Sequence, residues 1–234
     1  MQLKYHIPNA ITCCNLLSGC LSILFSFSGM PVAASLMIFA AGLFDFFDGF
    51  AARLLDAHSP IGADLDSLSD VVSFGVAPGM ILYRLMLEGR AEPIWPLGSV
   101  SGVACLAFLL PVFSAVRLAK FNVDDRQTTS FIGLPTTPLA LVMASLPLAY
   151  WQMGLLGQPV LNPYLGLGIA LLFSVMMVCN RPFFSFKVKS MRWKGNEVRW
   201  IFLIAAVLGL AVFRLVALPF ILLLYVLLSV LFYR

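Results

Sequence analysis

Eight apolar stretches, each near the length that crosses a lipid bilayer, constrain the fold of this chain more than any other feature. Hydrophobic residues make up 61% of its 234 residues and charged residues only 11%, whereas soluble domains are about 45–50% apolar. A transmembrane helix needs about 20 apolar residues, and long unbroken runs lack the alternating pattern of a membrane barrel. The sequence therefore predicts an all-α integral membrane protein with about eight transmembrane helices, at residues 10–28, 32–54, 64–88, 97–121, 135–154, 162–179, 199–214 and 217–232.

The last two of these runs are short, and only the segment from Arg214 to Pro219 separates them. We interpret them as two spans, with one broken or re-entrant hairpin as the alternative. No soluble region, low-complexity tract or obvious internal repeat interrupts the chain. Residues 1–234 are therefore interpreted as a single domain.

The lysines and arginines predict the orientation of the spans. With the N-terminus inside, twelve of the fifteen fall on one face, and only Arg84, Arg90 and Arg214 fall on the other. Because cytoplasmic loops carry the excess of positive charge, both termini are expected on the cytoplasmic side of the cytoplasmic membrane. The loop from Asn180 to Arg199 carries six basic residues and one acid. It is expected to rest on anionic lipids, although ordinary positive-inside bias explains it equally well.

Four aspartates lie within this apolar sequence, in two pairs. Asp45 and Asp48 are three residues apart near the end of the second run, and Asp66 and Asp70 are four apart in the third. Each spacing puts two carboxylates on one helical face. Carboxylates near hydrocarbon are costly unless they are paired, solvated or metal-bound. If the two helices are antiparallel, the pairs confront each other, and they predict a site for two divalent cations, Mg²⁺ or Mn²⁺, at the cytoplasmic edge of the membrane.

The residues between the two pairs indicate what these cations act on. Gly49 and Ala52 continue the face of the first pair and let a ligand approach closely. Arg53 is placed to pair with a phosphate, and Gly62 marks the break before the third run. This frame favours a diphosphate substrate whose cleavage the cations assist. The alternative is a transporter whose acids line an ion or proton pathway.

The acidic segment resembles the signature of a known enzyme family. Written with its spacing, the segment is Asp45-x2-Asp48-Gly49-x2-Ala52-Arg53-x8-Gly62-x3-Asp66-x3-Asp70. It is similar to the signature of the CDP-alcohol phosphotransferases at all eight fixed positions. The resemblance implies a homodimeric membrane transferase with a six-helix core around a two-metal site, followed in this chain by two C-terminal spans.

The same resemblance implies roles for individual residues. Asp45, Asp48 and Asp66 would be metal ligands, and Asp70 would both hold the second metal and act as the general base. The positions that match those holding the CDP-lipid in this family are Asn9, Thr12, Gly49, Ala52, Arg53, Ser59 and Gly62.

A second stretch bears on the acceptor alcohol. The segments 117–122 (Arg-Leu-Ala-Lys-Phe-Asn) and 131–135 (Phe-Ile-Gly-Leu-Pro) resemble those of membrane-embedded phosphatidylserine synthases, as does the opening Ile7–Thr12. The likeness extends over roughly residues 7–145. It implies transfer of a phosphatidyl group from CDP-diacylglycerol to L-serine, with release of CMP and with serine-binding donors at Arg117, Lys120 and Asn122.

Two alternatives stay open for this stretch. The acceptor could be glycerol 3-phosphate, inositol or an inositol phosphate, or choline. Arg117 and Lys120 could instead be boundary charges that reach the lipid headgroups. Nucleic acid is not expected among the partners.

Overall fold

The computed structural model of the protein describes residues 6–57, 59–89, 96–97, 100–123, 131–179, 182–183 and 197–232. Nearly all of these residues are helical, so the predicted all-α class is confirmed. Most of the basic loop between Asn180 and Arg199 lies outside the described residues, and so does its predicted contact with anionic lipids.

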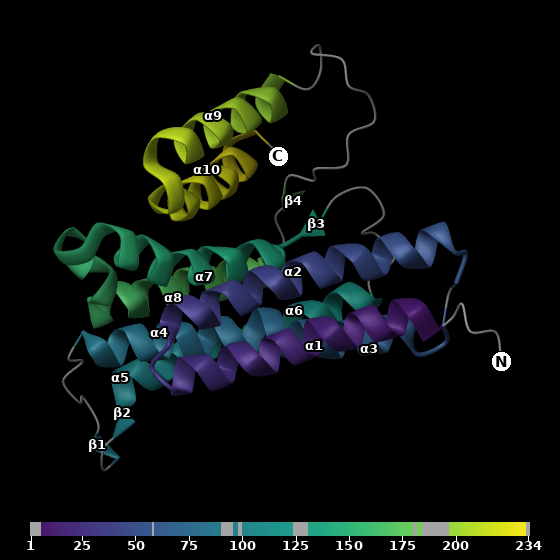
Figure 1. Ribbon diagram of the computed structural model, residues 1–234, viewed down its shortest axis with the longest axis horizontal. Coiled ribbons are helices and arrows are strands. Elements are labelled where there is room, and N and C mark those ends of the chain that lie inside the picture. The colour runs from purple at the N-terminus through teal and green to yellow at the C-terminus, as the bar shows by residue number, and fades with distance from the viewer. Residues whose placement is uncertain are drawn as a thin grey trace.

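The described residues form eight helical segments, each of which overlaps one of the predicted apolar runs, and Figure 1 shows their arrangement. Some of them change helix type along their length. In chain order they are α1 (His6–Phe27); α2 (Pro31–Leu54); α3 (Gly62–Asp70), η2 (Val71–Val76) and α4 (Ala77–Glu88); α5 (Gly102–Cys105), η3 (Leu106–Phe108) and α6 (Leu109–Val123); α7 (Thr136–Met153); η4 (Gly154–Leu161) and α8 (Pro163–Val178); α9 (Glu197–Phe213); and η5 (Arg214–Val216) and α10 (Ala217–Phe232).

The strands that the structure describes are two residues long and form two small antiparallel pairs. In one pair, β1 (Pro96–Leu97) lies beside β2 (Val100–Ser101), and in the other, β3 (Phe131–Ile132) lies beside β4 (Pro182–Phe183). The second pair ties the segment before α7 to the segment after α8.

Among the described residues, five helical stretches are long and apolar enough to cross a membrane, which makes the chain a multi-pass membrane protein. They are His6–Phe27, Pro31–Leu54, Gly62–Glu88, Gly102–Val123 and Trp200–Ile221, the last of which includes a turn at Arg214, and Pro163–Val178 is a shorter apolar helix. The number of eight spans therefore stays a prediction, although the eight helical segments lie where it puts them.

The C-terminal pair of helices is a hairpin that packs on α7, at the upper side of the bundle in Figure 1. The turn is at Arg214, whose φ of 52° is unusual for a residue with a side chain. The rings of Phe202 in α9 and Tyr225 in α10 are 6.3 Å apart between centroids, and both side chains join the core of the bundle beside Phe173 of α8. Two helices thus fold back on each other here, and both alternatives, two spans or one re-entrant hairpin, stay open.

Helix α1 turns its polar face inward and its apolar face outward. Its buried residues are Pro8, Thr12, Asn15, Ser18, Gly19, Ser22 and Ser26, whereas Leu17 and Leu24 are more than half exposed. Lipid tails are as apolar as leucine, so small and polar side chains favour helix–helix contacts in a membrane. The hydroxyl of Ser22, for example, donates to the carbonyl of Ala34 in α2 at 2.8 Å.

A close contact fixes α1 against the third helical segment, which consists of α3, η2 and α4. A Cβ added to Gly19 would lie 2.7 Å from the Cα of Ser73, inside the π-helical segment η2. Only a residue without a side chain permits this approach. The contact fixes the axial position of α1 relative to α3. The N-terminal ends of α1 and α3 and the C-terminal end of α2 come together at the right-hand end of the bundle in Figure 1.

We predict that Gly19→Ala lowers the free energy of unfolding by about 1–3 kcal/mol, because the new methyl group overpacks a backbone contact. Gly168→Ala in α8 is the matched control, since a Cβ there meets nothing within 4 Å. Thermal unfolding of both variants in the same detergent checks this. Equal melting temperatures would contradict it.

Candidate active site

Three of the four predicted metal ligands converge from two helices. Asp45 and Asp48 near the end of α2 and Asp66 in α3 each offer a carboxylate oxygen, and these oxygens all lie within 4.8 Å of one another. Three like charges this close repel one another strongly unless a cation lies among them. The antiparallel packing expected from the sequence thus brings the two acidic segments face to face.

The donor set fits a divalent cation. One oxygen of Asp66, Oδ1, is buried and has no hydrogen-bond partner in the part of the chain that the structure describes, which leaves it available as a ligand. Carboxylate oxygens are the ligands that Mg²⁺, Mn²⁺ and Ca²⁺ prefer. The acidic cluster can therefore hold a metal ion.

Asp70 lies one turn beyond Asp66 and is buried, with 8% of its surface exposed. It is not part of the group of oxygens within 4.8 Å that the described residues form. Instead its Oδ1 accepts a hydrogen bond of 3.2 Å from Nδ2 of Asn15 in α1. Its two predicted roles, second metal ligand and general base, stay predictions.

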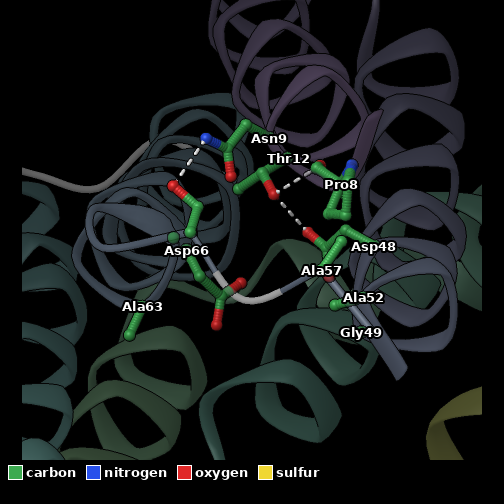
Figure 2. A pocket seen from close by; sticks show the side chains of 11 residues that line it. Pro8, Asn9, Thr12, Asp48, Gly49, Ala52, Ala57, Ala63 and Asp66 are labelled. Carbon is green, nitrogen blue, oxygen red and sulfur yellow. Dashed lines mark hydrogen bonds between the residues drawn. The ribbon is translucent and has the colours of Figure 1, made fainter. Parts of the chain in front are cut away.

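A pocket of about 230 Å³ opens beside the acidic cluster (Figure 2). Figure 2 shows Asp48 and Asp66 on opposite walls of it. Six of the seven residues predicted to hold the CDP-lipid are among its lining residues, which are Pro8, Asn9, Thr12, Asp48, Gly49, Ala52, Ala57, Ser59, Gly62, Ala63 and Asp66. Arg53, the seventh, is exposed and is not one of these.

The two glycines of the pocket differ in what surrounds them. A Cβ on Gly49 would meet nothing within 4 Å, so a side chain there would project into open space. A Cβ on Gly62 would make ordinary contacts of 3.5 and 3.6 Å with Ser59 and Asn9. Internal packing therefore requires glycine at neither position, and the free space above Gly49 is available to a ligand.

Hydrogen bonds join the start of α1 to both sides of the pocket, as the dashed lines in Figure 2 show. Nδ2 of Asn9 donates to Oγ of Ser59 at 3.1 Å. The hydroxyl of Thr12 lies 2.8 Å from Oδ2 of Asp48 and 3.0 Å from the carbonyl of Pro8. Because a hydroxyl has one hydrogen, Thr12 donates to one of these oxygens at a time.

The three residues predicted to bind the acceptor do not share one environment. Arg117 is only 7% exposed, and its guanidinium carbon lies 5.2 Å from the ring centroid of Phe121. Its Nε has no hydrogen-bond partner among the residues that the structure describes. This burial does not fit a boundary charge that reaches the headgroups. Lys120 is exposed. Asn122 is exposed as well, and its Nδ2 donates to Oγ of Ser67 in α3 at 2.9 Å.

Sequence reasoning missed Asn15 and Ser67, whose hydrogen bonds connect the acidic helix α3 to α1 and to α6, respectively. A signal for Asn15 is present in the first apolar run, where Asn9, Thr12 and Asn15 recur every three residues. This spacing places polar side chains on one face of a helix. No comparable pattern marks Ser67.

Comparison with known proteins agrees with the resemblance of the acidic segment. The chain is 36% identical over 155 residues to the CDP-diacylglycerol–serine O-phosphatidyltransferase of Mycobacterium tuberculosis, covering 63% of this chain and 51% of that protein. Proteins with the same name match from Bacillus subtilis, at 36% identity over 62% of this chain and 77% of the relative, and from Helicobacter pylori, at 34% over 78% and 73%.

The chain spans about half the length of the mycobacterial relatives that it matches. Residues 5–179, from the start of α1 to the end of α8, match the family model described as CDP-alcohol phosphatidyltransferase. This range contains the acidic cluster, the pocket and Arg117, and it ends before the C-terminal hairpin. The chain therefore belongs to the CDP-alcohol phosphatidyltransferase family.

Proposed function

We propose that this protein transfers a phosphatidyl group from CDP-diacylglycerol to L-serine, giving phosphatidylserine and CMP. The observation that carries the proposal is the meeting of Asp48 and Asp66 with the open space above Gly49 in one pocket. Cleavage of a diphosphate requires acidic ligands for a cation next to a space that holds the substrate. The names of the relatives supply the two substrates.

In this proposal Asp45, Asp48 and Asp66 hold one divalent ion, and Asp70 helps to hold a second. Either Mg²⁺ or Mn²⁺ suits these oxygen ligands. When bound, the ions neutralise the diphosphate and stabilise the charge that develops on the leaving group.

The protein's own side chains take up the proton and orient the substrates. Asp70 takes the proton of the serine hydroxyl, and the serine oxygen attacks the phosphorus that bears the diacylglycerol. A new O–P bond forms while the bond from that phosphorus to the bridging oxygen breaks, and CMP leaves with the electron pair. Direct attack inverts the configuration at phosphorus.

The pocket holds part of the CDP headgroup, and the acyl chains lie outside it among the membrane lipids. Its volume of about 230 Å³ is below the range of about 300–1,000 Å³ typical of pockets for whole small ligands. Asn9 and Thr12 line it from α1, Gly49 and Ala52 from α2, and Ser59 and Gly62 from the loop and the start of α3. Arg53, exposed at the end of α2, reaches a phosphate from outside the pocket.

The serine carboxylate binds near the end of α6. Arg117 is the buried cation there, and Lys120 and Asn122 are additional donors at the surface. A phosphorylated acceptor such as glycerol 3-phosphate would call for more arginines than this region offers. We further propose that the active site and both termini face the cytoplasm, that the protein is a homodimer, and that its basic loop contacts anionic lipids.

We predict serine-dependent release of CMP from CDP-diacylglycerol by the purified protein with Mg²⁺ or Mn²⁺. The acceptor panel is serine, glycerol 3-phosphate, inositol and choline. EDTA should abolish release, because the acidic cluster needs its cation, and restoring the ion should recover it. Turnover with another acceptor alone would overturn serine as the substrate. Metal transport into vesicles without any dependence on CDP-lipid would support the transporter instead.

We predict that Asp70→Asn retains CDP-diacylglycerol binding but lowers turnover by about 10²- to 10⁴-fold, the contribution typical of a general base. Asn keeps the size of the side chain and still accepts the hydrogen bond from Asn15, but it takes up no proton. Single-turnover kinetics and equilibrium binding of the CDP-lipid separate the two effects. Near-normal turnover would remove Asp70 from the role of base.

We predict that Gly49→Leu raises the KM for CDP-diacylglycerol at least about tenfold, because the new side chain fills the space meant for the headgroup. Gly168→Leu is the matched control, since a Cβ at either glycine meets nothing within 4 Å. Steady-state kinetics and melting temperatures of both variants provide the test. An unchanged KM in Gly49→Leu would show that the substrate does not use this pocket.

A further inference from the structure

A buried amide of the first helix touches the carboxylate that the proposed function uses as its base. Asn15 has no exposed surface, and its Nδ2 donates to Oδ1 of Asp70 at 3.2 Å. Asn15 and Asp70 are 55 residues apart in the chain, so this bond exists only in the folded protein. It spans from α1 to the last residue of α3.

Two serine hydroxyl groups on the buried face of α1 donate hydrogen bonds to backbone carbonyls and so stabilise the helix and its packing. The hydroxyl of Ser18 donates to the carbonyl of Cys14, and that of Ser22 donates to the carbonyl of Ala34. Thr12 and Asn15 are the residues of this face that the structure joins to aspartates, one in each acidic helix. The first helix thus supplies one donor to Asp48 and another to Asp70.

The amide of Asn15 is only half satisfied. Its Oδ1 is buried and has no hydrogen-bond partner among the described residues. An unpaired buried carbonyl detracts from stability, so packing alone is a poor reason for asparagine at this position. Its contribution is the donated bond to Asp70.

The backbone around Asp70 gives this bond a further importance. The regular helix α3 ends at Asp70, and the wider π-helical turn of η2 begins at Val71. Such turns often lie at functional sites and redirect the side chains beside them. One turn farther along α1, Gly19 lies against Ser73 of η2, so Asn15 is held at a fixed height opposite Asp70.

We propose that Asn15 is a positioning residue for Asp70. Its Nδ2–H engages Oδ1, holds the carboxylate in one rotamer and leaves Oδ2 to take the proton of the acceptor hydroxyl. This inference rests on the proposed function, because it concerns the base of that reaction. Asn15 itself touches neither substrate.

The test compares Asn15→Leu and Asn15→Ala with the wild-type protein. Leucine keeps the branched shape and the number of heavy atoms of asparagine, with a somewhat larger volume, but offers no donor and excludes water. Alanine opens a polar space in which a water molecule can donate to Asp70 instead. We expect Asn15→Leu to lower kcat by about 10- to 100-fold, as loss of a supporting hydrogen bond typically does, with the KM for CDP-diacylglycerol within about threefold of wild type. Asn15→Ala should lose less.

A purely structural role predicts the opposite order, because alanine leaves a cavity that leucine fills. In that case Asn15→Ala would have both the lower melting temperature and the lower activity. Ser22→Ala, on the same buried face of α1 and remote from the aspartates, is the control for loss of a polar side chain. It should keep wild-type kcat.

A double-mutant cycle with Asp70→Asn isolates the coupling. If Asn15 acts through Asp70, adding Asn15→Leu to Asp70→Asn should lower the residual turnover by less than about twofold. Multiplicative losses would overturn the inference. Binding of CDP-diacylglycerol by each variant shows that it is folded.

The outcomes separate this inference from the proposed function. Wild-type protein without serine-dependent release of CMP would contradict the proposed function itself. Wild-type activity together with an unchanged kcat in Asn15→Leu would leave the function standing and refute the role of Asn15.

Discussion

The cost of holding several carboxylates together beside hydrocarbon governs this structure. Asp45, Asp48 and Asp66 bring oxygens within 4.8 Å of one another, an arrangement whose repulsion needs a cation to offset it. The protein adds neutral donors, from Thr12 to Asp48 and from Asn15 to Asp70. Neutral donors stabilise a carboxylate without neutralising it, so they leave the full negative charge available to metal ions.

This demand explains the unusual character of α1. A helix that must reach two acidic helices with hydrogen-bond donors has to bury its polar face, and its leucines then face outward, where lipid solvates them. The Gly19–Ser73 approach serves the same end, because it brings the two backbones close enough for a short amide to reach Asp70. The packing of α1 therefore also decides whether its hydrogen-bond donors reach the aspartates of the site.

The sequence predicted the positions of the main described helices and the approach of Asp66 to Asp45 and Asp48, because apolar runs and carboxylate spacing are local patterns. It did not predict the partner of Asp70, the π-helical turn after it, or the burial of Arg117 beside an exposed Lys120. These features depend on how each helix is rotated against its neighbours, which side-chain packing between helices decides. Arg53 illustrates the difference: its place in the signature is plain in the sequence, but its exposure is not.

The site also divides by helix in a way that bears on substrate choice. The CDP side of the proposed reaction uses α1, α2 and α3, which line the pocket, whereas Arg117, Lys120 and Asn122 belong to α6. A hydrogen bond from Asn122 to Ser67, a residue between Asp66 and Asp70, links the two parts. Under the proposed function, the acceptor residues thus lie on a helix that carries none of the four aspartates. Under the proposed function, the buried guanidinium of Arg117 then decides between acceptors, since a desolvated cation attracts a carboxylate far more strongly than an exposed one does.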